Sequence, residues 1–328
     1  MSSRLSNSDR QLLSNSIKAE ALRLGFSACG IAKAEPVNRD AAEHLHHWLR
    51  NGNHADMHYM ANYTDKRLNP QLLMDGLKSI VCVALNYAPQ RTIDKGQYQF
   101  AAYAYGQDYH DIMKTKLTAL SQYVMQLLST STPYGDTPPN IRTFCDTAPV
   151  LERYWAMQAG LGWTGRNHQL IIPHAGSMFF LGELFLDAEL IYDHPIPNRC
   201  GNCHACIDAC PTKALSLDKE IDCHRCISYQ TIENRGAILQ QISAAMGNTI
   251  YGCDRCQQSC PYNRFAQPTT EPQLQPKEEL LQMQKQDWQN LSIDDYRRIF
   301  KGSAVKRAKY EGLMRNIKAA ADNTLTET

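Results

Sequence analysis

Nine of the twelve cysteines in this chain lie within residues 200–260, and their spacing constrains the fold more than any other feature. Residues 200–211 have the spacing C-x2-C-x2-C-x3-C-P, and residues 253–261 have the spacing C-x2-C-x3-C-P. Two further cysteines, Cys223 and Cys226, lie between these blocks. Paired blocks of this kind are typical of bacterial ferredoxins, in which three close cysteines hold one 4Fe–4S cluster and the cysteine before the proline ligates the other. The spacing therefore predicts a two-cluster module and a chain that transfers single electrons.

Cross-ligation of this kind assigns most of the cluster ligands. The first cluster takes three cysteines from the first block and one from the second, namely Cys200, Cys203, Cys206 and Cys260. The second cluster takes Cys253, Cys256, Cys210 and one more. Two clusters need eight ligands and nine cysteines are present, so either Cys223 or Cys226 is spare. We favour Cys226 as the eighth ligand because it lies nearer to the second block.

Structural zinc is the alternative, because C-x2-C pairs also hold zinc. Zinc sites built from two pairs explain neither the third cysteine at x2 spacing nor the two C-P endings. The polar N-terminus lacks the apolar segment of a secretory signal, so we expect a cytoplasmic protein whose cysteines ligate metals rather than form disulfides. The longest apolar runs, such as residues 80–85, are too short to span a bilayer, so we expect no membrane association.

Helical and strand-like segments alternate before the cysteines, which predicts an α/β (α+β) domain over residues 1–194. The expected elements are a helix at 8–25, a strand at 79–87, a helix at 111–128, a strand at 141–145, a helix ending near Gly160, and strands at 168–173 and 177–186. A loop rich in proline, glycine and threonine is expected at 131–140. A ferredoxin-like module with two 4Fe–4S clusters follows at 195–265, and a charged helical tail at 266–328.

Three segments of the N-terminal domain carry residues suited to chemistry. Residues 105–110 read Tyr-Gly-Gln-Asp-Tyr-His, although Asp108 is equally suited to cap the following helix. Residues 160–167 form a glycine-rich loop, which either lets the backbone approach a ligand or ends a helix. Asp146 precedes Pro149 and a helix, so it is an N-cap or, if buried in an apolar cavity, an acid with a raised pKa that delivers a proton at neutral pH.

Five motifs occur together with the cysteine blocks: Leu-Asn-Tyr (85–87), Tyr-Gly-Gln-Asp-Tyr-His (105–110), Asp-Thr-Ala-Pro-Val-Leu-Glu-Arg (146–153), Gly-Trp-Thr-Gly-Arg-Asn (162–167) and Gly-Ser-x-x-x-Leu-Gly-Glu (176–183). In this combination the chain resembles the epoxyqueuosine reductase family over about residues 10–318. The resemblance implies a cobalamin-dependent oxidoreductase with two 4Fe–4S clusters, which makes queuosine in tRNA. It also implies kinship with corrinoid reductive dehalogenases.

The resemblance assigns roles to individual residues. Asp146 would be the proton donor, and Cys226 would be the eighth cluster ligand. Cobalamin would lie between the N-terminal domain and the cluster module, and its candidate contacts are Arg67, Asp108, Tyr109, Asn167, Ser177 and Ser228. Cobalamin proteins with a histidine lower ligand use the motif D-x-H-x-x-G, which Asp108 and His110 begin but Met113 interrupts. The resemblance implies cobalamin bound without such a ligand.

The expected partners are a tRNA with epoxyqueuosine in its anticodon loop and a low-potential electron donor, and we expect a monomer. The net charge of +1 gives no global basic field, so the tRNA would meet a local patch. The tail offers candidates for phosphate contact, with Tyr310 interleaved, although such runs also form solvated helix faces: Lys301, Lys306, Arg307, Lys309, Arg315 and Lys318. Many family members continue into a helical-repeat extension that helps to grip tRNA, whereas this sequence ends at Thr328.

Three other functions stay open at this point. A reductive dehalogenase acting on a small organohalide would use the same cofactors, although its respiratory members carry an export signal. A plain electron-transfer subunit would bind no corrin and would not depend on Asp146. A tRNA-binding protein with clusters as structural staples would bind tRNA without turnover.

Overall fold

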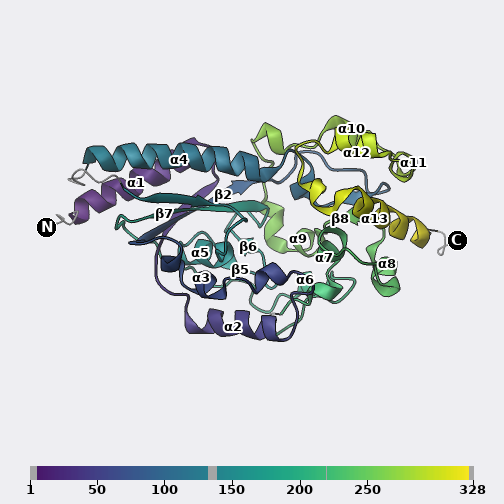
Figure 1. Ribbon diagram of the computed structural model, residues 1–328, viewed down its shortest axis with the longest axis horizontal. Coiled ribbons are helices and arrows are strands. Elements are labelled where there is room, and N and C mark those ends of the chain that lie inside the picture. The colour runs from purple at the N-terminus through teal and green to yellow at the C-terminus, as the bar shows by residue number, and fades with distance from the viewer. Residues whose placement is uncertain (1–5, 132–138, 219, 325–328) are drawn as a thin grey trace.

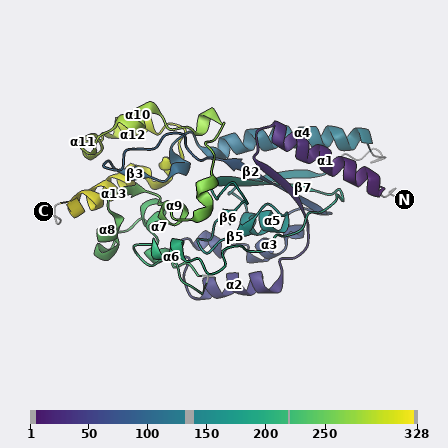
Figure 2. The same ribbon diagram turned by 180° about the vertical axis from the view of Figure 1, so that it is seen from behind.

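The computed structural model describes residues 6–131, 139–218 and 220–324, so most of the loop expected at 131–140 lies outside the described residues. The molecule is elongated, with α1 (Asn7–Arg23) and α13 (Lys309–Thr324) at opposite ends (Figures 1 and 2). A four-stranded sheet occupies one half, and the short elements of the cysteine-rich region lie in the other. Within the described ranges, no helix is both long enough and apolar enough to cross a membrane.

The sheet has the strand order β1–β2–β7–β4, and all neighbouring strands are antiparallel. Its strands are β1 (Ala28–Lys33), β2 (Ser79–Asn86), β4 (Ile141–Phe144) and β7 (Phe179–Leu186). The central strands β2 and β7 read SIVCVALN and FFLGELFL, which are nearly continuous apolar runs typical of strands buried on both faces. An antiparallel sheet covered by helices is an α+β arrangement rather than an α/β one, and the sequence had allowed both classes.

Alternate residues of β2 point to opposite faces of the sheet. Val81 and Val83 belong to the hydrophobic core that includes α1 and α4, whereas Ile80 and Cys82 belong to a second core that includes α5. Figure 1 shows α1 and α4 along one face of the sheet, and α3 and α5 on the other. The helices of the N-terminal part after α1 are α2 (Arg39–Arg50), α3 (Thr64–Leu68), α4 (Tyr109–Ser131) and α5 (Glu152–Gln158).

The cysteine-rich region is built from short elements joined by turns. They are α6 (Ala205–Asp208), α7 (Ile227–Ile232), α8 (Gln240–Met246), β8 (Thr249–Tyr251) and α9 (Arg255–Gln258). Strand β8 pairs in parallel with β3 (Gln99–Phe100), so the region expected at 195–265 shares a small sheet with the N-terminal part. A second small sheet is formed by β5 (Trp163–Thr164) and β6 (Leu170–Ile171).

The tail expected at 266–328 is non-helical at 266–271 and largely helical over the rest of its described part. Its helices before α13 are α10 (Glu278–Gln282), α11 (Lys285–Gln289) and α12 (Ile293–Ile299). Trp288 is fully buried, and its ring centroid lies 5.1 Å from that of Phe100 in β3. Leu313 of α13 is buried in the same core. The tail therefore packs against the N-terminal part and contributes to a core that all three expected regions share.

Most of the expected elements are confirmed with small shifts in their bounds. The helix expected at 8–25 is α1, and Gly25 follows it with a φ of 91°, a conformation that favours glycine. The strand expected at 168–173 is shorter, because only the two residues of β6 form a ladder and Ile172 makes an isolated bridge with Gly176. The structure also contains short 3-10 helices at His58–Met60, Pro70–Leu72, Ala102–Ala104, Cys223–Arg225, Pro261–Phe265, Pro272–Leu274 and Ala304–Ala308.

Candidate active site and iron–sulfur module

Four cysteines from the two blocks line one cavity of about 290 Å³, namely Cys200, Cys203, Cys206 and Cys260. Helix α6 carries Cys206, Cys260 follows closely after α9, and these two short helices pack against each other. Cys206 is buried whereas Cys203 is exposed, so this cavity reaches the protein surface. The structure therefore brings together the four residues that the spacing assigned to the first cluster.

The other three thiols of this cavity affect the pKa of Cys206. The pKa of Cys206 is raised to about 11, mainly by burial. Neighbouring thiolate charges contribute to this rise, from Cys260, Cys200 and Cys203. The indole Nε1 of Trp163 donates a hydrogen bond to Cys200 Sγ at 3.5 Å, and hydrogen bonds to ligand sulfurs help to set a cluster's reduction potential. The donor set suits a 4Fe–4S cluster, which binds cysteines as thiolates.

A second group of four cysteines lies further from solvent, and none of its members is exposed: Cys210, Cys226, Cys253 and Cys256. Burial raises the pKa of Cys256, and the charges of Cys253 and Cys226 raise it further. The pKa of Cys226 is raised mainly by burial, with a contribution from the charge of Cys210. The four thiols are therefore within electrostatic reach of one another.

Cys223 and Cys226 lie close together, and Cys226 packs against the apolar cluster that holds Cys223, but the two differ in which other cysteines they affect. Cys223 is buried in a small apolar cluster with Ala55 and Tyr229. The charge of Cys226, by contrast, raises the pKa of both Cys253 and Cys256. The structure thus brings Cys226 to the cysteines of the second block, as the sequence favoured, and the ligand roles themselves stay predictions.

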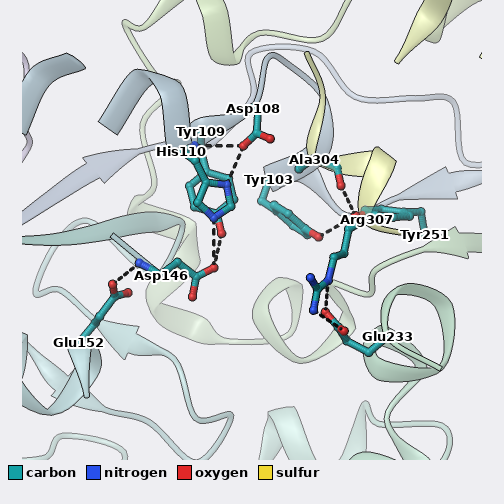
Figure 3. A network of polar contacts seen from close by, with 10 residues as sticks. All are labelled: Tyr103, Asp108, Tyr109, His110, Asp146, Glu152, Glu233, Tyr251, Ala304 and Arg307. Carbon is teal, nitrogen blue, oxygen red and sulfur yellow. Dashed lines mark hydrogen bonds and ion pairs between the residues drawn. The ribbon is translucent and has the colours of Figure 1, made fainter. Parts of the chain in front are cut away.

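The residues expected to perform acid–base chemistry meet at the start of α4. Tyr109 and His110 open this helix, and Asp146 lies in the loop after β4 with a φ of 53°. The Tyr109 hydroxyl donates a hydrogen bond to Asp146 Oδ2, and His110 Nε2 lies 3.7 Å from the same oxygen. His110 Nδ1 is 2.7 Å from Asp108 Oδ1 (Figure 3). The ring of Tyr109 is fixed by stacking on Phe180 of β7 at a centroid distance of 4.1 Å.

Charges around His110 favour its protonated form. The hydrogen bond to Asp108 is the largest cause that raises the pKa of His110, and the charges of Asp146 and Glu152 contribute. The same hydrogen bond lowers the pKa of Asp108. The backbone N–H of His110 also donates to Asp108 Oδ1 at 3.1 Å, so Asp108 caps the start of α4 as well. Burial raises the pKa of Tyr109, which keeps its hydroxyl available as a donor.

Asp146 itself is not buried. Its side chain is 59% exposed, so the apolar cavity considered from the sequence does not surround it. The N-cap interpretation is wrong, because Leu151 occupies the N-cap position of α5 and no side chain caps that helix. The backbone N–H of Asp146 instead donates to Glu152 Oε1. Asp146 is therefore held through its backbone, and its carboxylate contacts Tyr109 and His110.

Two glutamates next to Asp146 were not identified from the sequence. Burial raises the pKa of Glu152 to about 8, and the charge of Asp146 contributes. Glu183 of β7 is fully buried. Burial is the largest cause that raises its pKa, and the charge of Glu152 is the second largest. Neither carboxylate oxygen of Glu183 has a hydrogen-bond partner in the described part of the chain. The available signal was a lone acidic residue within the apolar run FFLGELFL.

A second set of polar residues faces Asp146 (Figure 3). Arg307 donates to both carboxylate oxygens of Glu233, at 2.9 and 2.8 Å. The guanidinium carbon of Arg307 lies 5.9 Å from the ring centroid of Tyr59. The pKa of Tyr59 is raised to about 12, mainly by burial, and the charges of Glu233 and Asp146 contribute. Tyr59 is thus within electrostatic reach of both sides of the site.

The candidate cofactor contacts fall into two groups, and the first group surrounds Asp146. Asp108 and Tyr109 form, with His110 and Asp146, a group of polar residues that we call the Asp146 cluster. Arg67 is nearly buried and donates to the backbone carbonyl of Tyr59 at 3.0 Å. Its guanidinium therefore supports the segment that carries Tyr59.

The second group lies toward the deeper cysteines. Asn167 is 3% exposed, and its Nδ2 donates to the Cys256 carbonyl over a long 3.4 Å. The backbone N–H of Ser177 donates to Asn263 Oδ1 at 2.7 Å. Ser228 belongs to α7, which begins directly after Cys226. The six candidates thus extend from Asp146 to the second cysteine group, and their roles as cofactor contacts stay predictions.

Two of the six basic tail residues are already engaged within the protein. Arg315 donates to the backbone carbonyls of Asn234 and Gly236, both at 2.7 Å, and Arg307 pairs with Glu233. Four other basic side chains of the tail are exposed, namely Lys301, Lys306, Lys309 and Lys318. The surface available to an RNA in this region is therefore provided mainly by lysines.

The fold and the site together define a class of protein, the iron–sulfur oxidoreductases: an α+β domain with an acid–base cluster is packed against two four-cysteine groups. The family model described as "Epoxyqueuosine reductase QueG, DUF1730" matches residues 67–147. The model described as "4Fe-4S double cluster binding domain" matches residues 199–263.

Similar proteins identify the family. The epoxyqueuosine reductase of Cellulophaga algicola is 44% identical over 304 residues, which are 93% of this chain and 96% of that protein. A crystal structure of epoxyqueuosine reductase with an epoxyqueuosine-modified tRNA-Tyr stem loop matches with a TM-score of 0.85 and 26% identity, covering 95% of this chain and 81% of the other. A Bacillus subtilis epoxyqueuosine reductase with its catalytic aspartate loop swung out of the active site matches with a TM-score of 0.83 and 26% identity, covering 95% and 82%. This chain belongs to the epoxyqueuosine reductase family, which confirms the resemblance.

Proposed function

We propose that this chain reduces epoxyqueuosine in the anticodon loop of tRNA to queuosine, with electrons that pass through two 4Fe–4S clusters to cobalamin. The observation that carries the proposal is that two four-cysteine groups and the Asp146 cluster occur together in a chain of this family. The related structure with a bound stem loop supports the tRNA substrate. In the reaction both C–O bonds of the epoxide break, a C=C bond forms, and the oxygen leaves as water after taking up two electrons and two protons.

The two cysteine groups hold the clusters as thiolates in this proposal. The ligands of the first cluster are Cys200, Cys203, Cys206 and Cys260. Those of the second cluster are Cys210, Cys226, Cys253 and Cys256. The first group includes the exposed Cys203, whereas the second contains no exposed cysteine and adjoins Ser228 of α7. Electrons therefore enter at the first cluster and reach the active site from the second.

Cobalamin supplies low-valent cobalt for the attack on the epoxide when it is bound. We place it between Asp146 and the second cysteine group, where the candidate contacts lie: Arg67, Asp108, Tyr109, Asn167, Ser177 and Ser228. The buried Nδ2 of Asn167 makes one long hydrogen bond, whereas its Oδ1 accepts from the Gln169 backbone N–H, so Nδ2 has donor capacity for a polar cofactor group. The imidazole of His110 is engaged at Nδ1 by Asp108 and faces Asp146 at Nε2.

Asp146 delivers a proton to the departing oxygen. Its carboxylate is exposed toward the site, and Tyr109 holds it by a hydrogen bond. His110 has a raised pKa and lies 3.7 Å from Asp146, so it is placed to restore the proton that Asp146 has given away. The catalytic aspartate loop of the Bacillus subtilis relative, which can swing out of its active site, supports a mobile role for this exposed loop.

The tRNA contacts the protein through its phosphates and presents a base splayed from the anticodon loop. The exposed Lys306 and Lys309 are close to Arg307 in the chain, and Arg307 faces Asp146 in the site (Figure 3). Phosphate contact by these lysines makes binding salt-dependent but carries no sequence information.

Anaerobic turnover of a stem loop that contains epoxyqueuosine tests the proposal. The protein is reconstituted with both clusters, with and without cobalamin, and the nucleoside is followed by mass. We expect the loss of one oxygen atom only when cobalamin is present. Intact, reducible clusters and bound cobalamin without any loss of oxygen would contradict the proposal.

A further inference from the structure

The rim of the first cysteine cavity is positively charged. Three arginines line this cavity together with the four cysteines, namely Arg166, Arg199 and Arg264. No aspartate or glutamate is among its lining residues, which all belong to the described part of the chain. Arg199 and Arg264 are exposed, as is Cys203. A positive edge therefore surrounds the point at which the first cluster meets solvent.

The charge of this rim is not neutralised by the protein. Within the described ranges, none of the three arginines forms an ion pair, whereas surface arginines elsewhere do, such as Arg39 with Glu43 at 2.6 Å. Arg166 donates instead to the Gly201 carbonyl at 3.0 Å. The guanidinium carbon of Arg264 lies 4.6 Å from the ring centroid of its neighbour Phe265.

The rim is also fixed in position. The hydroxyl of Tyr262 donates to the backbone carbonyl of Arg199 at 3.0 Å. The ring of Tyr262 packs edge-on against Trp163, with centroids 4.8 Å apart, and Trp163 donates to Cys200. The charges are therefore presented by a packed surface that is continuous with the ligands of the first cluster.

We propose that the rim of Arg166, Arg199 and Arg264 is the docking surface for the electron donor, and that this donor is a small one-electron carrier protein with an acidic face around its own redox centre. The inference rests on the proposed function, in which electrons enter at the first cluster. Opposite charges steer such encounters and orient the partners, and transient redox complexes bury little surface. An RNA ligand is less favoured here because exposed lysines that could contact phosphate, Lys306 and Lys309, are close in the chain to Arg307 at the other site.

Cluster reduction in the holoprotein tests this inference without any tRNA. An acidic flavodoxin in its hydroquinone state is mixed anaerobically with the protein, and bleaching of the cluster absorbance is followed by stopped flow. We expect the double variant Arg199→Glu/Arg264→Glu to be reduced at least about 10-fold more slowly than wild type at low ionic strength. We expect the difference to shrink at high salt, where the charges are screened. Dithionite is itself an anion, so it is compared at high salt, where its charge is screened, and there it should reduce both proteins at the same rate.

The matched control is Arg39→Glu/Lys114→Glu, which changes the net charge by the same amount at exposed positions outside the rim. This control should be reduced like wild type. If the charge reversal impairs cluster loading, Arg199→Gln/Arg264→Gln should show a smaller slowing in the same direction. Equal flavodoxin rates for the rim variants and wild type at low salt would overturn the inference. Weaker stem-loop binding with an unchanged flavodoxin rate would overturn it in favour of an RNA surface.

Discussion

The iron–sulfur module and the Asp146 site are encoded in different ways. The candidate cluster ligands all lie within residues 200–260, and the short helices α6 and α9 bring the two blocks together. The Asp146 site instead combines the start of α4, the loop after β4, the first residue of α5 and the middle of β7, and it faces Arg307 from the tail. The comparison teaches that ligand spacing encodes a metal site locally, whereas the environment of an acid is produced by the whole fold.

The comparison between the two regions depends most strongly on the assignment of Cys226, and not Cys223, as the eighth cluster ligand. Cys226→Ala removes a ligand of the second cluster, so we expect the protein to lose about half of its iron and all measurable turnover. Cys223→Ala is the matched control, because it removes a neighbouring buried thiol that packs against Ala55 and Tyr229. It should keep its full iron and sulfide content. The reverse pattern in anaerobic iron and sulfide analysis would show that Cys223 is the eighth ligand.

Asp146→Asn separates chemistry from electron supply. We expect turnover of the stem loop to fall by about 10²–10⁴-fold, the usual contribution of a general acid. Chemical reduction of the clusters should be unchanged, because Asp146 lies outside both cysteine groups. Glu43→Gln, at an exposed carboxylate of α2, is the control and should leave both quantities unchanged. A variant that turns over at the wild-type rate would remove Asp146 from the mechanism.

The sequence predicted the cysteine groups well, because cluster ligands must lie close together and their spacing is visible in the chain. It also selected Asp146, but it gave the wrong environment: the structure exposes this residue, half-buries Glu152 and fully buries Glu183 beside it. This difference in exposure between Asp146 and the two glutamates depends on how the loop after β4 packs against β7, which a local sequence pattern cannot predict. The sequence likewise placed Arg315 among the candidate surface charges, although Arg315 donates hydrogen bonds to backbone carbonyls of the cysteine-rich region.

Glu152 should leave a signature in the pH dependence of stability. An unfolded glutamate loses its proton near pH 4.5, whereas burial keeps folded Glu152 protonated up to about pH 8. Between these pH values the folded protein binds more protons than the unfolded chain, so its free energy of unfolding falls as the pH rises. We expect Glu152→Gln to flatten this fall and to be more stable than wild type at pH 8, by about 1–3 kcal/mol.

Thermal unfolding of the cluster-loaded protein at pH 5 and pH 8, under anaerobic conditions, measures this effect. The gain in Tm of Glu152→Gln over wild type should be larger at pH 8 than at pH 5. Glu43→Gln again serves as the exposed control and should follow wild type at both pH values. The same gain at both pH values would show that Glu152 does not titrate in this range.

The smallest expected effect concerns Trp163. Its indole N–H donates to Cys200 Sγ, and such a donor stabilises the more negative, reduced cluster. Trp163→Phe should therefore lower the potential of the first cluster, by roughly 40 mV if the hydrogen bond contributes about 1 kcal/mol. Trp155→Phe, a buried tryptophan of α5, is the control. A redox titration followed by electron paramagnetic resonance that gives equal potentials for both variants would contradict the assignment.

Counting electrons in a single turnover tests most directly whether the two regions act in one reaction. The protein, loaded with cobalamin and fully reduced at both clusters, is freed of external reductant and mixed anaerobically with the epoxyqueuosine stem loop. The account predicts that one oxygen atom is lost from the nucleoside for every two electrons that leave the clusters. Loss of oxygen while both clusters stay reduced, or oxidation of the clusters with the oxygen retained, would contradict it.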